Sequence, residues 1–123
     1  MATDSEHQRQ ARHNREFLDG IDSKKFPDWV AVVAFYTAVH LVQALFSLSG
    51  DRCRSHRQRN ELLRQKFPAI WKHYHPLYSF SRLARYWCMK VVPDQVPYVV
   101  RRLGRLEREI EAEAEAYRKR GTP

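Results

Sequence analysis

The arrangement of apolar and polar positions predicts several helices of unequal character. From Trp29 to about Leu48 almost every position is apolar. A surface helix would show an apolar stripe and a polar face, so this pattern predicts a central helix surrounded by protein. Ser49-Gly50-Asp51 then breaks the helix, and Asp28 stands where it can cap the start.

Two outer segments flank this central stretch. The segment from Ser5 to Leu18 is polar with sparse apolar positions, and Gly20 follows it as a helix stop. The last helix begins near Asp94. Its apolar residues step by four, three and four positions, as on one helix face: Val99, Leu103, Leu106 and Ile110. Beyond Glu111 the helix turns polar, so we expect its end to project or to pair with another chain.

The middle of the chain predicts two more helices. In the stretch SHRQRN, Ser55 and Gln58 have the spacing of a capping box, so a helix starts there and runs to about Lys66. Pro68 suits the first turn of the next helix, which extends to about Met89. Pro76 should kink or restart that helix, because proline has no backbone N–H to donate.

Together these segments predict an all-α protein, an up-down bundle of about five helices. Residues 1–123 form one domain, with a core from about residue 11 to 110 and a polar helix end over residues 111–123. Four glycines and almost no regular apolar–polar alternation argue against a β protein.

The composition favours a cytoplasmic protein that does not enter the membrane. The N-terminus is polar from its first residues, so no signal peptide is expected. The most apolar stretch, Trp29 to Phe46, is barely long enough to span a bilayer and is interrupted by Tyr36, Thr37, His40 and Gln43. Two cysteines, Cys53 and Cys88, imply no disulfide framework and suit a reducing cytoplasm.

Positive charge is concentrated in the middle third of the chain. The formal net charge is +8. Residues 51–90 hold ten Lys or Arg against two Asp or Glu, whereas residues 1–50 and 91–123 are each close to neutral. Aromatic residues are interleaved with these cations. The pattern is typical of a surface that binds RNA or another polyanion, and a basic surface that is merely solvated gives it too.

Two polar faces supply the candidate site residues. His56 and Arg59 share one face at a helix start, where backbone N–H groups and cations attract anions. On the central helix, Tyr36, His40, Gln43 and Ser47 form a polar stripe that needs polar partners. The candidate nucleic-acid contacts are Arg54, Arg57, Arg59, Arg82, Arg85 and Tyr86. We expect His56 and Arg59 to meet His40 and Arg82 or Arg85 around one cleft. Two alternatives remain open. His40 would have only a structural role, or His56 and Arg59 would point into solvent.

The sequence predicts neither a metal nor another cofactor. His73 and His75 stand two positions apart on a helix and so point to different faces, and neither cysteine belongs to a C-x-x-C pair. There is no Gly-rich phosphate loop and no G-x-S-x-G turn. The alternating glutamates from Glu107 to Glu115 are interpreted as solvated charges.

Four stretches, in this order, resemble a branch of the HEPN superfamily: ARHNREFL, FPDWVAVVAFYTAVHLVQALF, RSHRQRN and LYSFSRLARYW. The resemblance runs from about Ala11 to Trp87. It implies a compact bundle of four to five helices that forms a homodimer. It also implies a role with RNA in a toxin–antitoxin or CRISPR-linked defence system, where an antitoxin or another defence protein would be a partner. Many HEPN domains are metal-independent endoribonucleases, in which an R-x(4–6)-H motif at the dimer interface acts on the ribose hydroxyl and the developing phosphorane charge.

This chain departs from that motif, because no histidine has an arginine five to seven positions before it. If the protein cleaves RNA, the general base and the cations must come from different helices. The candidate catalytic residues are His40, His56, Arg59 and Arg82. The alternative function is a non-catalytic dimeric helical module that binds a partner.

Overall fold

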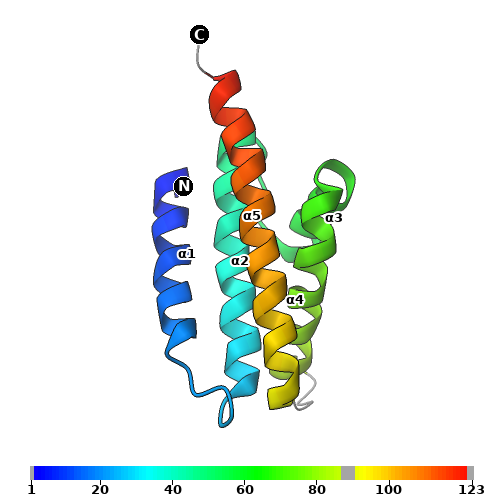
Figure 1. Ribbon diagram of the computed structural model, residues 1–123. Helices are drawn as coiled ribbons and strands as arrows, with labels where there is room; N and C mark the ends of the chain where they lie inside the picture. Colours follow the sequence, from blue (N-terminus) through cyan, green and yellow to red (C-terminus); the bar gives the residue numbers. More distant parts are fainter. Residues whose placement is uncertain (1, 87–90, 122–123) are drawn as a thin grey trace.

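The computed structural model describes residues 2–86 and 91–121. In that part of the chain it contains five α-helices, a short 3₁₀ turn and no strand. The elements are α1 (Asp4–Asp19), α2 (Pro27–Ser49), α3 (His56–Lys66), α4 (Pro68–Tyr86), η1 (Pro93–Gln95) and α5 (Val96–Arg120). Figure 1 shows α1 antiparallel to α2 and α4 antiparallel to α5, with the short α3 beside α4. The prediction of an all-α bundle is confirmed.

Helix α2 is the centre of the bundle, as its composition predicts, and it packs against α1, α4 and α5. Phe35, Val42 and Leu45 on α2 are completely buried. By length and composition α2 could cross a membrane, but 61% of its most apolar stretch is buried inside the protein. The expectation that protein surrounds α2 fails on one face, where Trp29 is 54% and Tyr36 is 37% exposed. Three neighbouring helices leave that face open.

The helix starts depend on local capping, with two differences from the sequence predictions. The Ser55 hydroxyl caps α3 by accepting from the Gln58 N–H at 3.1 Å. However, Gln58 Oε1 accepts from the Arg54 N–H at 2.8 Å and does not return to Ser55. Asp28 does not cap α2, because that helix already begins at Pro27. Asp28 instead lies in the first turn, where the helix dipole favours a negative charge.

Helix α4 continues through Pro76, so the expectation that the helix restarts there is wrong. Proline leaves the carbonyl of the residue four positions earlier, Lys72, without its helical donor. Lys72 is exposed, so water can hydrate this carbonyl. The predicted end of this helix, near Met89, lies outside the described residues.

Helix α5 buries the predicted face: Val99, Leu103, Leu106 and Ile110 all lie in the core. Packing extends beyond Glu111, because Ala114 is buried and the Tyr117 ring lies 6.5 Å from that of Phe67. Figure 1 shows the end of α5 extending past the other helices.

Replacing Leu103 by alanine should lower the free energy of unfolding by about 2–5 kcal/mol, because a completely buried leucine would leave a cavity in the core. Arg101→Ala, at an exposed position on the same helix, should change it by less than about 0.5 kcal/mol. Urea denaturation followed by circular dichroism measures both values. Equal losses in the two variants would contradict the placement of this helix face.

Candidate nucleic-acid interface

Arg59 is the most unusual residue of the basic middle third, because its side chain is buried. It lies on α3 and is only 6% exposed. Its Nη1 donates to Nδ1 of His56 at 2.9 Å, as the three-residue helical spacing allows. Across residues 2–86 and 91–121, no Asp or Glu forms an ion pair with Arg59, and its Nε has no hydrogen-bond partner. A buried cation without an anion costs several kcal/mol.

The contact with Arg59 determines which nitrogen of His56 carries hydrogen. A guanidinium only donates, so Nδ1 of His56 accepts and the ring hydrogen resides on Nε2. The His56 ring packs between Phe35 at 5.5 Å and Tyr78 at 5.9 Å between centroids. Burial lowers the pKa of His56, and the charges of Arg59, Arg85 and Arg82 lower it further. His56 is therefore held neutral near pH 7.

Arg82 and Arg85 on α4 alternate with tyrosine rings, in what we call the arginine–tyrosine ladder: Tyr36, Arg85, Tyr86, Arg82 and Tyr78. The Arg85 guanidinium carbon lies 5.1 Å from the Tyr36 ring centroid and 4.7 Å from that of Tyr86. The Arg82 guanidinium carbon lies 5.4 Å from Tyr86 and 5.6 Å from Tyr78. Arg85 also donates to the Tyr36 hydroxyl. The ladder spans α2 and α4, and Tyr86 is 63% exposed.

His40 on α2 joins this region, but its hydrogen-bond partner comes from α1. Nδ1 of His40 lies 3.0 Å from Nδ1 of His7. Burial lowers the pKa of His40, and the neighbouring His7 and Arg59 lower it further. The sequence analysis missed His7. The spacing of His7, Ala11 and Leu18 was the available signal, because it puts them on one face of α1, and Ala11 and Leu18 are buried.

The structure separates the predicted arginines into two groups. Arg59, Arg82 and Arg85 act together on His56, whose pKa all three lower. Arg57 lies on another face of α3, where it lines an open hollow of about 570 Å³ with Arg52 and Glu61. Arg54 is exposed just before α3. Three arginines of the predicted basic set therefore lie near His56, and one of them, Arg59, also acts on His40.

Several polar groups near the site have no partner. Of the buried side-chain atoms in the described segments, Asn60 Oδ1, Ser81 Oγ and Arg85 Nε make no hydrogen bond. Burial raises the pKa of Tyr74 on α4 to about 12, and the charge of Arg59 and a hydrogen bond from it act in the opposite direction. These groups lie on α3 and α4, the two helices that carry the three clustered arginines. Buried polar groups usually have a protein or water partner, so an ordered water molecule is the simplest partner for each of these atoms.

His73 and His75, the two histidines considered for a metal site, have structural contacts. His73 is buried and accepts from Arg102 Nη1 at 3.0 Å, which links α4 to α5. His75 is exposed and lies against Trp71, with ring centroids 4.9 Å apart. Among the described residues, no three His, Cys, Asp or Glu side chains are close enough to hold a metal ion.

Another hollow is not lined by Arg59, Arg82 or Arg85. It has a volume of about 650 Å³ and lies between α1 and α5, with Leu41, Ala44 and Leu45 of α2 among its lining residues. An ion pair between Arg15 and Glu107, at 3.6 Å, crosses from α1 to α5 there. Its lining carries charges of both signs, so it does not have the character of a polyanion site.

A comparison with protein-family models finds no match for this chain, and a comparison with curated proteins finds no relative. The resemblance to the HEPN superfamily therefore depends on the four sequence stretches alone.

Acidification should destabilise the fold through its partly buried histidines. Burial lowers the pKa of His7, His40 and His56 in the folded protein, whereas an unfolded histidine titrates near about 6.5. As the pH falls from about 7.5 to about 5.5, the unfolded chain takes up protons first, so the free energy of unfolding decreases. Urea denaturation across this pH range measures the slope.

Two variants test whether the partly buried histidines cause this pH dependence of the free energy of unfolding. His40→Asn should make it shallower, because one histidine with a lowered pKa is removed. His13→Asn, at an exposed position on α1, should keep the slope of the parent. A free energy of unfolding that is constant or rises on acidification would contradict the prediction.

Proposed function

We propose that this protein is a HEPN-like, RNA-associated protein of the cytoplasm, from a defence or toxin–antitoxin type system, and that it binds RNA at Arg59, Arg82, Arg85 and Tyr86. The single observation that carries the proposal is the buried Arg59 guanidinium, which has no carboxylate partner in the described part of the chain. A phosphate would supply the missing negative charge and accept charge-assisted hydrogen bonds.

The arginine–tyrosine ladder supports RNA over a small anion. Tyr86 and Tyr36 are the exposed rings of the ladder, and both contact Arg85. Exposed rings can stack on unpaired bases while neighbouring arginines neutralise the backbone, which is how proteins commonly hold single-stranded nucleic acid. An isolated phosphate would need the cations but not the rings.

Cleavage of the bound RNA is the second part of the proposal. A metal-independent endoribonuclease needs a general base for the ribose hydroxyl and cations for the developing charge. In this protein His40 or His56 would act as the base, and Arg59 and Arg82 would stabilise the charge. These groups come from α2, α3 and α4, which agrees with the lack of an R-x(4–6)-H motif in one segment.

A non-catalytic interaction module is the competing function, and exposed apolar side chains favour it. Phe17, Phe26 and Trp29 are each about half exposed or more. Exposed aromatic groups at one end of a small bundle are frequent at protein interfaces. A partner such as an antitoxin or a second copy of the chain would cover them. This function requires no affinity for RNA beyond that of any basic protein.

RNA binding should depend on the clustered arginines and on salt. We expect Arg85→Gln and Arg59→Met each to weaken the binding of a labelled single-stranded RNA by about tenfold or more, since each removes a charged hydrogen-bond donor. Arg101→Gln, on the exposed face of α5, should weaken it by less than about threefold. Fluorescence anisotropy at several salt concentrations gives the affinities and their salt slope, and RNA integrity after incubation shows whether cleavage follows.

The same variants separate binding from folding. Arg59→Met should leave the melting temperature unchanged or raise it, because it replaces an uncompensated buried charge by an apolar side chain. His56→Ala should weaken RNA binding in the same way. Parent-like affinity in Arg59→Met and His56→Ala, or binding that does not change with salt, would reject the RNA function and favour the interaction module.

We also propose that the protein is a homodimer whose interface covers the Trp29 end of the open face of α2 and leaves Tyr36 exposed. Light scattering should then give about twice the chain mass of 14.7 kDa at micromolar concentration. Trp29→Ser should shift the population toward monomer, because it removes exposed apolar surface from this face. Val92→Ser, at an exposed position outside α2, serves as the control. A parent protein that is monomeric under these conditions would contradict the proposal.

A further inference from the structure

The contact between His7 and His40 joins the first helix to the candidate site. Their Nδ1 atoms lie 3.0 Å apart and their ring centroids 5.2 Å apart, with His7 near the start of α1 and His40 in the second half of α2. Because each ring uses Nδ1 for this contact, Nε2 is the only ring nitrogen of His40 that remains for a ligand. The hydrogen bond needs one hydrogen between two nitrogens, so one ring donates and the other accepts.

The surrounding charges favour His7 as the donor. Burial lowers the pKa of His7, but Glu6 and Asp4 on α1 raise it again. His40 has no such support, because the charges that act on it are those of His7 and of Arg59 on α3, and both lower its pKa. Arg59 also acts on His7, in the same direction. A proton taken up by the pair is therefore more stable on His7; both ring nitrogens of His7 then donate, and Nδ1 of His40 accepts.

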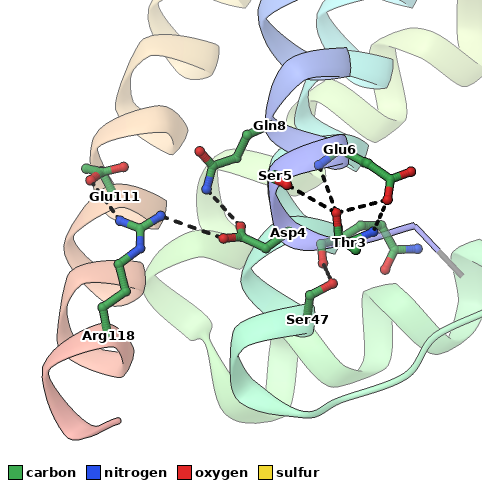
Figure 2. A network of polar contacts seen from close by, with 9 residues as sticks. Thr3, Asp4, Ser5, Glu6, Gln8, Ser47, Glu111 and Arg118 are labelled. Atoms are coloured by element: carbon green, nitrogen blue, oxygen red, sulfur yellow. Dashed lines mark hydrogen bonds and ion pairs between the residues drawn. The ribbon is translucent and has the colours of Figure 1, made fainter. Parts of the chain in front are cut away.

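The turn that carries His7 is held in place from several sides. Thr3 forms a capping box with Glu6, and the amide of Gln8 donates to Asp4 at 2.8 Å (Figure 2). Arg118 on α5 forms ion pairs with Asp4 at 4.0 Å and with Glu111 at 3.4 Å. The ion pair with Asp4 links the last turns of α5 to the start of α1. The Asp4 and Glu6 carboxylates that act on His7 thus belong to a capped, cross-linked turn.

We propose that His7 is a positioning residue of the site, which donates to Nδ1 of His40 and thereby keeps the hydrogen of His40 on Nε2, where it is a donor for a phosphate oxygen. This inference rests on the proposed function. Arg59 imposes the same tautomer on His56. His40, His56 and the three arginines then offer donors only. Such a set matches an oxyanion and supports the binding part of the proposed function. It argues against the cleavage part, because neither histidine presents a free basic nitrogen to act as the general base.

Two variants of nearly equal size test the direction of this hydrogen bond. The side-chain amide or carboxylate of asparagine or aspartate reaches the place of a histidine Nδ1. His7→Asn can still donate to His40, so His40 should keep its hydrogen on Nε2. His7→Asp can only accept near neutral pH, so the hydrogen of His40 should move to Nδ1. Long-range ¹⁵N–¹H NMR spectra of the imidazole rings report the tautomer directly.

RNA affinity provides the second readout. His7→Asn should bind a labelled single-stranded RNA within about threefold of the parent. His7→Asp should bind about tenfold or more weakly, since the Nε2–H donor is lost. His13→Asp adds the same charge at an exposed position on α1 and controls for simple repulsion.

Two results would overturn the inference: a parent protein in which His40 carries its hydrogen on Nδ1, or equal weakening by His7→Asp and His13→Asp. If the parent binds no RNA at all, the proposed function fails. The NMR tautomer then still decides whether His7 positions His40.

Discussion

The packing of α2 against α1, α4 and α5 supports both the fold and the candidate site. Phe35, Val42 and Leu45 are completely buried on this helix, and burial of apolar surface is the main favourable contribution to folding. Three neighbouring helices cover only part of the cylinder. The uncovered face is the one that carries Tyr36 and His40, so the packing of the core determines where polar side chains can meet.

The gathering of positive charge at that face opposes stability. Arg59 is buried without a carboxylate in the described structure, and Arg82 and Arg85 lie close enough to lower the pKa of the same histidine, His56. Uncharged groups offset part of this cost. Nδ1 of His56 accepts a hydrogen bond from Arg59, and the Tyr86 ring lies against Arg82 and Arg85. Within the described residues, these rings and neutral acceptors take the place of a carboxylate partner for Arg59, Arg82 and Arg85.

Local sequence signals predicted the parts of the site that lie within one helix. The three-residue spacing of His56 and Arg59 put them on one face of α3, and the two side chains are hydrogen-bonded. The polar stripe of α2 was expected to meet polar partners inside the protein, but Tyr36 in that stripe is 37% exposed. The same reasoning failed for two residues. Arg57 was grouped with Arg59 by charge but lies on another face of α3, and α4 continues through Pro76, where the carbonyl that loses its helical donor belongs to the exposed Lys72.

The sequence by itself determined the helical class, the central place of α2 and the buried face of α5, because these follow from the period of apolar residues along one helix. Only the tertiary structure decided which helix meets which. The pairing of His7 with His40 joins residues 33 positions apart, and Arg85 reaches Tyr36 over 49 positions. Such contacts depend on the rotation and offset of whole helices against each other, which are set by how side chains interdigitate in the core rather than by any local pattern.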